Sequence, residues 1–248
     1  MTNWRVWALL AGKSEMDQSM ATYAEGMGQA LIIPHTMFLL KGPTTVVVDT
    51  SFESPEAVRG AYPQRIWREP EEEPLELLRQ LAVTADQVSL VVCTHLHYDH
   101  CGTNRRFARA RIVAQRVELA YALDPVAHLM RREYFAPTGG FTPPYEPDRL
   151  ELLDGDTDLG EGLTVLHLPG HTPGSQGLMV DTTRGTLGLA GDQIMVRENY
   201  DQGVPVGLHT DLDAWYLSLE KLRHHASWVA PSHDLRLFSR GSRIQELT

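Results

Sequence analysis

The feature that most constrains this chain is a cluster of histidines that directly follows an apolar run. Residues His95–His100 read HLHYDH, so three imidazoles and a carboxylate fall within six residues. The run Val88–Thr94 before them is rich in β-branched residues and predicts a buried strand that ends at the histidines. Alternate residues of an extended backbone point to one side, so His95 and His97 can reach a single ion. Asp99 and His100 lie just beyond them and can serve a second ion.

Imidazole and carboxylate ligands together suit a borderline metal such as Zn²⁺, and also Fe, Mn or Co. The alternative is a polar loop that happens to be rich in histidine. Because the cluster stands at the end of a predicted buried strand, the pattern favours the metal site.

The composition excludes some classes of function. With 248 residues, 42% of them hydrophobic and 22% charged, the chain is typical of a soluble globular protein, and we expect one domain over residues 1–248. It has 22 Lys and Arg against 32 Asp and Glu, a formal charge of −10. This balance argues against a nucleic-acid-binding face, which would be basic. A small anionic substrate stays open, because bound metal cations would reverse the field locally.

The two cysteines, Cys93 and Cys101, lie beside the histidine cluster. They support no disulfide framework and favour a reducing compartment. The N-terminal apolar segment is too short for a signal peptide, and no run approaches the roughly 18 apolar residues of a membrane helix. We therefore expect a cytoplasmic protein without a membrane partner.

The pattern of apolar runs predicts two batches of strands, each with helices near its end. The expected strands are Arg5–Leu10, Leu31–Leu40, Thr44–Asp49, Val88–Thr94, Arg111–Ala114, Leu163–Leu168, Gly177–Asp181, Thr186–Ala190 and Ser227–Ala230. The expected helices are Pro74–Leu81, Val117–Leu123, Ala127–Tyr134 and Asp211–His225. Residues 11–30 are expected as a loop and residues 52–73 as surface. Two packed mixed sheets with helices outside them, an α+β fold of the αββα sandwich type, fit this order.

Two further features have an open interpretation. Asp49 ends a predicted buried strand, where it is either a turn or cap residue or a hydrogen-bonding partner of a metal ligand. The stretch Ala136–Pro147, with four prolines and two adjacent glycines, is either a binding loop to which Phe141 adds apolar surface or a passive insertion.

Three more candidate ligands also stand where a predicted strand ends: His171, Asp192 and His233. Strand ends gathered at one edge of a sheet are a common way to build a site on a rigid scaffold. Each residue alone could be a turn or cap residue. Together with the His95–His100 cluster they favour one shared site.

The ordered motifs resemble those of the metallo-β-lactamase superfamily. They are His-x-His-x-Asp-His at 95–100, Pro-Gly-His-Thr-Pro-Gly at 169–174, Gly191-Asp192 and Ser232-His233-Asp234, and with Asp49 they span most of the chain. The resemblance implies the αββα sandwich and two divalent metal ions. It implies His95, His97 and His171 for the first ion, Asp99, His100 and His233 for the second, and Asp192 as the bridge between them. It also matches Asp49 to the early aspartate at the end of a strand.

Within that superfamily the chain is similar to the N-acyl-homoserine lactone lactonases and to 4-pyridoxolactonase. Its opening motifs, Ala11-Gly12 and Ile33-Pro34, and its length resemble theirs. Those lactonases carry a tyrosine three residues after the bridging aspartate, where this chain has Met195, and many relatives have glycine where it has Ser51. The candidate substrate contacts are therefore His35, Tyr98, Met195, Tyr200 and Phe141.

The resemblance implies a zinc hydrolase that opens a small cyclic ester by attack of a metal-bridging hydroxide, with Asp99 or Asp192 passing a proton to the leaving alkoxide. Its partner is a small-molecule substrate, and the chain is a monomer or homodimer. Hydrolysis of a cyclic amide, a thioester or a β-lactam is the nearest alternative. Asp192 argues against a β-lactamase, because the true β-lactamases of this fold lack that carboxylate. Iron-dependent redox chemistry on the same fold is the more distant alternative.

Overall fold

Two sheets pack face to face in the computed structural model, which describes residues 3–58, 65–126, 133–134 and 143–248. The strands are β1 (Arg5–Asp17), β2 (Ala30–Lys41), β3 (Thr45–Val48), β4 (Ile66–Trp67), β5 (Leu90–Val92), β6 (Arg111–Gln115), β7 (Leu150–Leu153), β8 (Thr157–Gly160), β9 (Leu163–His167), β10 (Gln176–Thr182), β11 (Gly185–Leu189), β12 (Trp228–Val229) and β13 (Ile244–Glu246). The helices are α1 (Gln18–Ala21), α2 (Pro55–Val58), α3 (Pro74–Gln80), α4 (Tyr98–Cys101), α5 (Arg116–Leu123), α7 (Arg197–Asp201) and α8 (Leu212–His225), together with short 3₁₀ turns.

The first sheet has the order β13-β1-β2-β3-β5-β6-β7, with β4 paired to β1. Its β1, β2 and β3 are antiparallel neighbours, whereas β3, β5, β6 and β7 run parallel. The second sheet has the order β12-β11-β10-β9-β8, antiparallel except for the β11–β12 pair. Because β3 and β5 are parallel, their carboxyl ends, which carry Asp49 and the histidine cluster, meet at one edge of the sheet.

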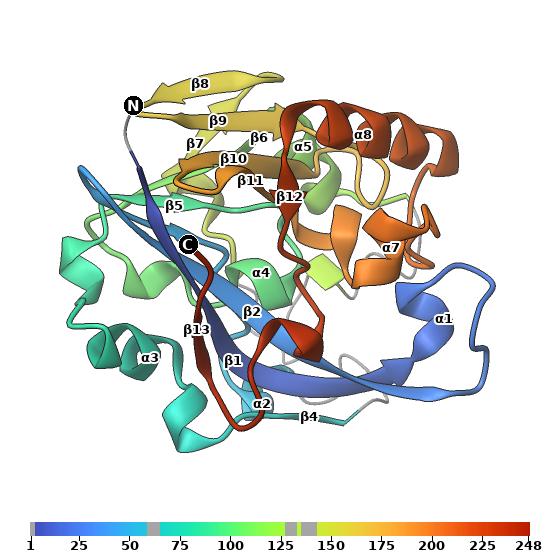
Figure 1. Ribbon diagram of the computed structural model, residues 1–248, viewed down its shortest axis with the longest axis horizontal. Coiled ribbons are helices and arrows are strands. Elements are labelled where there is room, and N and C mark those ends of the chain that lie inside the picture. Colours follow the sequence, from blue (N-terminus) through green and yellow to red (C-terminus); the bar gives the residue numbers. More distant parts are fainter. Residues whose placement is uncertain (1–2, 59–64, 127–132, 135–142) are drawn as a thin grey trace.

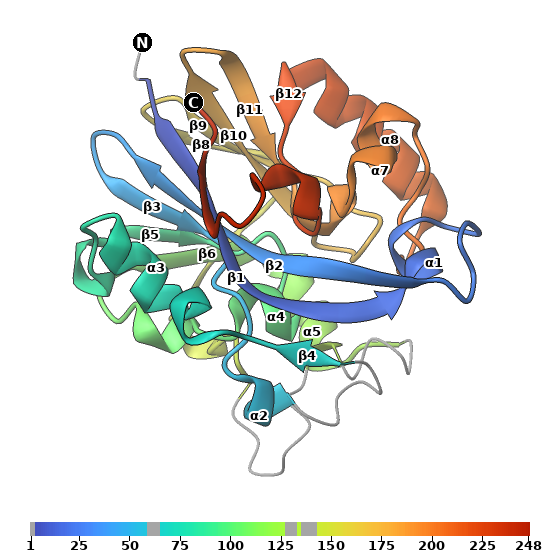
Figure 2. The same cartoon turned by 60° about the horizontal axis from the view of Figure 1, so that its bottom comes forward.

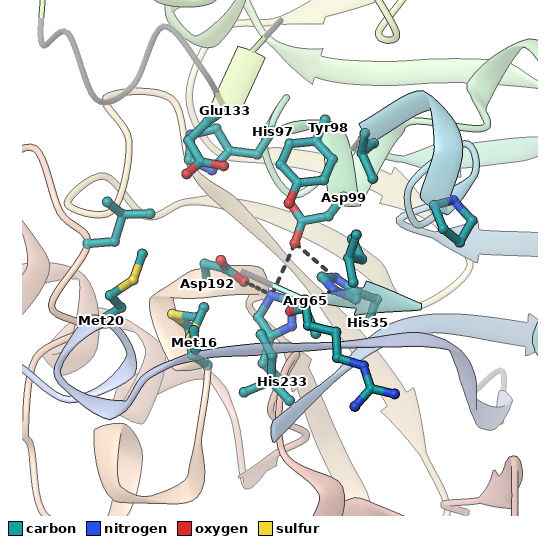
Figure 3. A pocket seen from close by; sticks show the side chains of 17 residues that line it. Met16, Met20, His35, Arg65, His97, Tyr98, Asp99, Glu133, Asp192 and His233 are labelled. Carbon is teal, nitrogen blue, oxygen red and sulfur yellow. Dashed lines mark hydrogen bonds and ion pairs between the residues drawn. The ribbon is translucent and has the colours of Figure 1, made fainter. Parts of the chain in front are cut away.

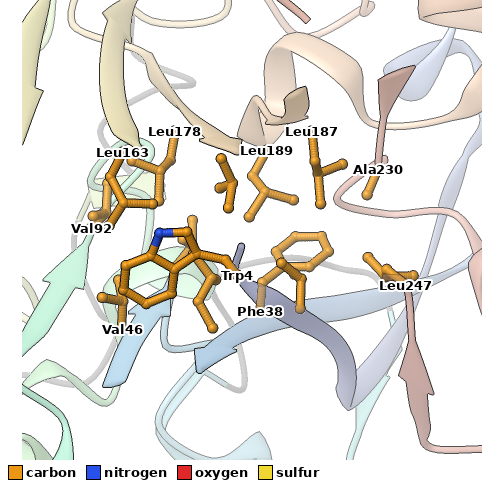
Figure 4. Close-up of a cluster of buried hydrophobic side chains, with 14 of the residues drawn as sticks. Trp4, Phe38, Val46, Val92, Leu163, Leu178, Leu187, Leu189, Ala230 and Leu247 are labelled. Atoms are coloured by element: carbon orange, nitrogen blue, oxygen red, sulfur yellow. The ribbon is translucent and has the colours of Figure 1, made fainter. Parts of the chain in front are cut away.

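The core between the sheets is apolar. Phe38 and Val92 from the first sheet face Leu178 and Leu189 from the second, and Trp4 joins them (Figure 4). All five are at most 2% exposed. Burying such side chains contributes roughly 1.5–3 kcal/mol each, which makes this layer the main support of the fold.

Helices cover the outer face of each sheet. Leu77 and Leu78 of α3 pack on the first sheet, and Trp215, Leu219 and Leu222 of α8 pack on the second. Figure 2 shows α3, α4 and α5 on one side of the molecule and α8 on the other, while Figure 1 gives the same layers from a second direction. The αββα order expected from the sequence is confirmed. Within the described part of the chain, no helix is long and apolar enough to cross a membrane.

The prediction of a loop over residues 11–30 is wrong up to Ala21, because β1 continues to Asp17 and α1 follows it directly. Gly12, at φ +124°, stands within a register shift between Leu10 and Lys13, and beyond it the polar residues Lys13–Asp17 pair with β2. The pairing satisfies their backbone groups although no apolar pattern marks the strand. The predicted helix Ala127–Tyr134 falls largely outside the described residues.

Candidate metal centre

The histidine cluster lies on the turn between β5 and α4, at the edge where β3 also ends. His97 has an extended backbone and caps α4, so the chain changes direction between His97 and Asp99. A Cβ at Gly102, just after α4, would lie 2.7 Å from the Cα of Phe52. Glycine at this position therefore allows α4 to approach the segment after β3, which brings His100 to Asp49.

Three histidines form the first half of the site. The Nε2 of His95 lies 2.9 Å from the Nδ1 of His97, and the Nε2 of His171 lies 3.2 Å and 3.1 Å from these two atoms. His171 comes from the loop after β9, where its Nδ1 donates to the carbonyl of Leu208 at 2.6 Å, so its Nε2 carries a bare lone pair. Burial is the main cause that lowers the pKa of all three imidazoles, which favours their neutral, ligating form.

His100 and His233 form the second half, with Asp99 beside them. Their Nε2 atoms are 3.3 Å apart, and each lies 3.7 Å from Oδ2 of Asp99. His233 donates from Nδ1 to the carbonyl of Pro34 at 2.7 Å, so its Nε2 also faces the centre. Burial opposes the protonation of His100 and His233, but the neighbouring carboxylates, Asp192 foremost, outweigh it and raise the pKa of both rings.

Asp192 stands between the two halves. Its Oδ1 lies 3.2 Å from His100 Nε2 and 3.0 Å from His233 Nε2, and its Oδ2 lies 3.6 Å from His171 Nε2. Ser232 donates to Oδ1 at 2.8 Å and orients the carboxylate. Gly191, at φ +52°, lets the turn pass Thr94, whose Oγ1 would be 2.3 Å from an added Cβ. Asp192 thus offers one oxygen to each half.

These residues fit a metal centre by the chemistry of their donors. Three groups of side chains among the described residues could each hold an ion, because the ligand atoms within each group lie within 4.8 Å of one another. The groups are His95, His97 and His171; His95, His100 and Asp192; and His35, Asp99 and His233. Lone pairs on buried ring nitrogens repel one another, so such nitrogens come this close only when they share a cation or a proton. Imidazoles fixed by outward hydrogen bonds, with carboxylates between them, are the usual surroundings of Zn²⁺ and similar ions.

Asp49 is a hydrogen-bonding partner of His100 and Thr94. Its Oδ2 accepts from Nδ1 of His100 at 2.7 Å and from Oγ1 of Thr94 at 2.8 Å, and its Oδ1 accepts from the backbone N–H of Thr94 at 2.7 Å. These bonds fix the tautomer of His100 so that Nε2 faces the centre. Of the two interpretations of Asp49, the geometry matches this one rather than the helix cap.

The model of the metallo-beta-lactamase superfamily matches residues 33–233 of this chain. The chain belongs to the metallo-beta-lactamase superfamily. Curated relatives include the N-acyl homoserine lactonase AiiA of Bacillus thuringiensis subsp. kurstaki, 28% identical over an alignment of 217 positions, which covers 83% of this chain and 82% of the relative. The N-acyl homoserine lactonase AttM of Azorhizobium caulinodans is 28% identical over an alignment of 256 positions, which covers 94% of each chain.

Solved structures of other proteins share the fold of this chain. A mutant of B. thuringiensis AiiA with N-decanoyl-L-homoserine bound at its active site superposes with a TM-score of 0.79, at 23% identity, over 95% of each chain. AidC, a dizinc quorum-quenching lactonase, superposes with a TM-score of 0.70 at 17% identity, over 95% of this chain and 89% of its own. At these identities the likeness shows the fold.

A cavity of about 230 Å³ opens over the centre of this superfamily member (Figure 3). Its floor carries His97, Asp99, Asp192 and His233, while His95, His100 and His171 do not line it. The remaining lining residues are Ser14, Met16, Met20, Ile33, His35, Pro55, Val58, Arg65, Ile66, Tyr98, Glu133, Met195 and Leu208. The walls are thus mainly apolar, and their polar residues are Ser14, His35, Arg65, Tyr98 and Glu133.

Three of the expected substrate contacts line this cavity: His35, Tyr98 and Met195. His35 is hydrogen-bonded on both sides, through Nδ1 to Oδ2 of Asp99 at 3.0 Å and through Nε2 to Oγ of Ser14 at 3.1 Å. It therefore holds Asp99 in place, a role that its sequence position did not indicate. Figure 3 shows His35 and His233 on either side of the Asp99 carboxylate.

Tyr200 does not line the cavity, contrary to the expectation. It lies on α7, where its ring is 5.4 Å from the guanidinium of Arg223 on α8. The first turn of α7 is held by the side chain of Asn199, which accepts from Val196 N and donates to Ala21 O. Phe141 lies outside the described residues.

Sequence reasoning missed two ionisable residues of the cavity wall, Arg65 and Glu133, and one buried residue beside the centre, Glu118. Arg65 stacks over the ring of Trp67 at 4.7 Å. Glu133 is buried with its carboxyl group at the cavity, and burial is the main cause that raises its pKa. Neither residue belongs to a motif. The sequence does hold one indication of Glu118, because it is an acidic residue in the first turn of a helix that directly follows a strand.

Proposed function

We propose that this protein is a dinuclear metal-dependent lactonase that opens a small cyclic ester, such as an N-acyl-homoserine lactone. The observation that carries the proposal is the geometry of Asp192, which offers one oxygen to each of two histidine groups on the floor of an apolar cavity. The lactonases among the curated relatives support the choice of substrate class.

The first ion is assigned to His95, His97 and His171, the second to Asp99, His100 and His233, with Asp192 shared between them. This donor set favours Zn²⁺ and also accepts Fe, Mn or Co. When bound, such a pair supplies a water of lowered pKa and a Lewis acid for the ester carbonyl.

The chain's own residues supply the proton transfer. Hydrolysis adds water across the ester bond, and the ring oxygen leaves as an alkoxide that must take up a proton. Asp99 and Asp192 are the two carboxylates of the metal centre that also line the cavity, so they are the candidates to hold this proton and deliver it. The hydrogen bond of 3.0 Å between His35 Nδ1 and Asp99 Oδ2 gives the Asp99 carboxylate a defined orientation. This favours Asp99 over Asp192 as the group that delivers the proton.

The walls of the cavity bind the rest of the substrate. Met16, Met20 and Ile33 come from β1, α1 and β2, and Leu208 faces the same space. Unbranched methionine side chains adapt to ligands of different shape, which suits a flexible acyl chain. We place the acyl chain along this wall and the lactone ring over Asp192, with Tyr98 and Met195 beside it.

The remaining parts of the proposal rest on the sequence. The protein acts in the cytoplasm on a small molecule, without nucleic acid, as one domain over residues 1–248 and as a monomer or homodimer. The formal charge of −10 supports the exclusion of nucleic acid.

A panel of lactones tests the proposal. The purified protein, first stripped with a chelator and then reloaded with Zn²⁺, is given short- and long-chain N-acyl-homoserine lactones, fused aromatic lactones, a cyclic amide, a thioester and a β-lactam. Ring opening is followed by proton release. We expect turnover of at least one lactone class, lost in the stripped protein and in His171→Ala. Turnover of none of the lactones would refute the proposal, as would one iron per chain with oxygen uptake.

A further inference from the structure

A buried glutamate beside the metal centre joins three separate segments of the chain. Glu118 lies in the first turn of α5, is 0% exposed, and does not line the cavity. Its Oε1 accepts hydrogen bonds from Leu96 N at 3.0 Å and Tyr134 Oη at 2.9 Å. Its Oε2 accepts from Thr172 Oγ1 at 2.7 Å and Gly174 N at 3.1 Å. Glu118 and its four hydrogen-bond donors together form the Glu118 network.

Two of these bonds reach the loops that carry the first three histidines. Leu96 is the residue between His95 and His97, so its backbone N–H fixes the turn from which both imidazoles project. Thr172 follows His171 directly, and its hydroxyl binds the other carboxylate oxygen. Glu118 therefore ties together two loops that are more than 70 residues apart in sequence and whose side chains must meet at one ion.

The third bond acts on His97 through Tyr134. The ring of Tyr134 lies 4.7 Å from the ring of His97 at an angle of 62°. His95, His100, His171 and His233 each have a hydrogen bond on the nitrogen that faces away from the centre. The Nε2 of His97, in contrast, is buried and has no hydrogen-bond partner among the described residues. The orientation of His97 thus depends on packing, and the packing ring is held by Glu118.

The Pro-Gly-His-Thr-Pro-Gly motif is shaped to this contact. A Cβ at Gly174 would lie 2.3 Å from Cβ and 2.4 Å from N of Glu118. Any larger residue at position 174 would push α5 away and lengthen the bonds from Thr172 and Gly174. The last glycine of the motif is therefore explained by the close approach of Glu118 rather than by the metal ligands.

We propose that Glu118 is the positioning residue of the three-histidine half of the centre, acting on His95 and His171 through the backbone and on His97 through Tyr134. The inference rests on the proposed function, because it assigns an ion to that half. It predicts that the Glu118 network controls the affinity of the first ion and leaves the second ion, which His100 and His233 hold, nearly unchanged.

Glu118→Gln tests this inference with little change of volume. An amide nitrogen replaces one acceptor oxygen, so two of the four donors lose their partner. The two dissociation constants for Zn²⁺ are measured on the full-length protein by competition with a chromogenic chelator. His171→Ala and His233→Ala mark which binding step belongs to which half. We expect Glu118→Gln to weaken the step lost in His171→Ala by about 10–100-fold, the usual effect of removing an outer partner of metal ligands, and to leave the other step within about threefold.

Glu72→Gln is the matched control. Glu72 is 1% exposed and bonded to Lys13 and to the backbone of Glu69, and it does not line the cavity over the centre. We expect it to lower the thermal midpoint while both Zn²⁺ constants stay within about threefold of the wild-type values.

Tyr134→Phe, which keeps the ring and removes only the hydroxyl, is the second test variant if Glu118→Gln does not fold. It is expected to weaken the first step by about 3–10-fold, the size of one net hydrogen bond.

The inference is overturned if Glu118→Gln or, in its place, Tyr134→Phe binds both ions as the wild type does, or weakens both steps equally. Lactone turnover by the wild type is measured in parallel. A wild type that binds two ions but opens no lactone would refute the proposed function and leave the assignment of Glu118 to be decided by the two constants alone.

Discussion

Replacing Asp49 by asparagine should weaken the binding of the second ion, because it moves the imidazole proton of His100 to the nitrogen that faces the centre. Asp49 has φ +58°, a conformation that asparagine tolerates better than most residues, so the backbone should be retained. The new amide nitrogen cannot face the backbone N–H of Thr94, because two donors would meet. It must take the place of Oδ2, where the Thr94 hydroxyl can rotate to accept. His100 Nδ1 must then accept as well, which moves the imidazole proton to Nε2, the atom that faces the centre.

The magnitude follows from these contacts. The bond from His100 Nδ1 to Asp49 Oδ2 is 2.7 Å long and fully buried, and a hydrogen bond to a charged group contributes about 1.5–3 kcal/mol. Loss of an outer partner of a metal ligand costs about 10–100-fold in affinity, which is about 1.4–2.8 kcal/mol. The two figures agree. Asp49→Asn should therefore weaken the Zn²⁺ step that is lost in His233→Ala by about 10–100-fold.

Chelator competition measures this effect, and Asp17→Asn provides a control with the same number of bonds. Asp17 accepts from Ser19 N, Ser19 Oγ and Gly28 N, at the start of α1 and away from the metal ligands. Both Zn²⁺ constants should remain as in the wild type in that variant. The reasoning would be refuted if Asp49→Asn bound both ions as tightly as the wild type, or if only the first step weakened.

Three further predictions follow from single contacts. Gly174→Ala should lower the free energy of unfolding in urea by about 1–3 kcal/mol, because its Cβ would overlap Glu118, and an unchanged midpoint would contradict this. Burial alone would raise the pKa of Asp234, but hydrogen bonds from Arg236 and Arg197 hold it below 3.8. The stabilisation that ionised Asp234 provides is therefore complete above pH 3.8 and is lost as the pH falls through the lower pKa of the folded state. The loss of unfolding free energy caused by Asp234→Asn should accordingly shrink in acid. A difference in unfolding free energy between wild type and variant that stays constant from about pH 7 to about pH 2 would refute this prediction. Met195→Tyr adds a hydroxyl at the cavity and should raise kcat/KM for an N-acyl-homoserine lactone about 3–10-fold, the size of one net hydrogen bond, whereas a fall would show that Met195 is needed as it stands.

The sequence was sufficient for the strands that combine apolar periodicity with a motif at their end. Val88–Thr94 and Leu163–Leu168 both lead into histidines, and β5 and β9 lie within them. The edge strands β7, β8 and β13 were missed, because their residues are half-exposed and mix polar with apolar types. The polar end of β1 was missed for the same reason: its stability comes from pairing with β2, which is a long-range contact.

The candidate ligands were predictable because their residue types and spacing are restrictive. All seven come together in the structure, although four separate segments of the chain supply them. The residues around them were not predictable to the same degree. The roles of His35 and Glu118 depend on contacts between segments 64 and 56 residues apart, such as His35 with Asp99 and Glu118 with Gly174. A single sequence carries no signal for such pairs. Tyr200 shows the converse, because it was a plausible contact and instead lies beside Arg223, outside the cavity lining.

The most direct test of the central claim is lactone ring opening as a function of Zn²⁺ added to the stripped protein. Proton release is recorded on an N-acyl-homoserine lactone while bound metal per chain is determined by elemental analysis of the same samples. If Asp192 joins two ions in one catalytic centre, the rate should rise until two equivalents are bound and then stay constant, and Asp192→Asn should lose most of it. A rate that reaches its plateau at one bound equivalent, or a protein with two bound ions and no ring opening, would contradict the account.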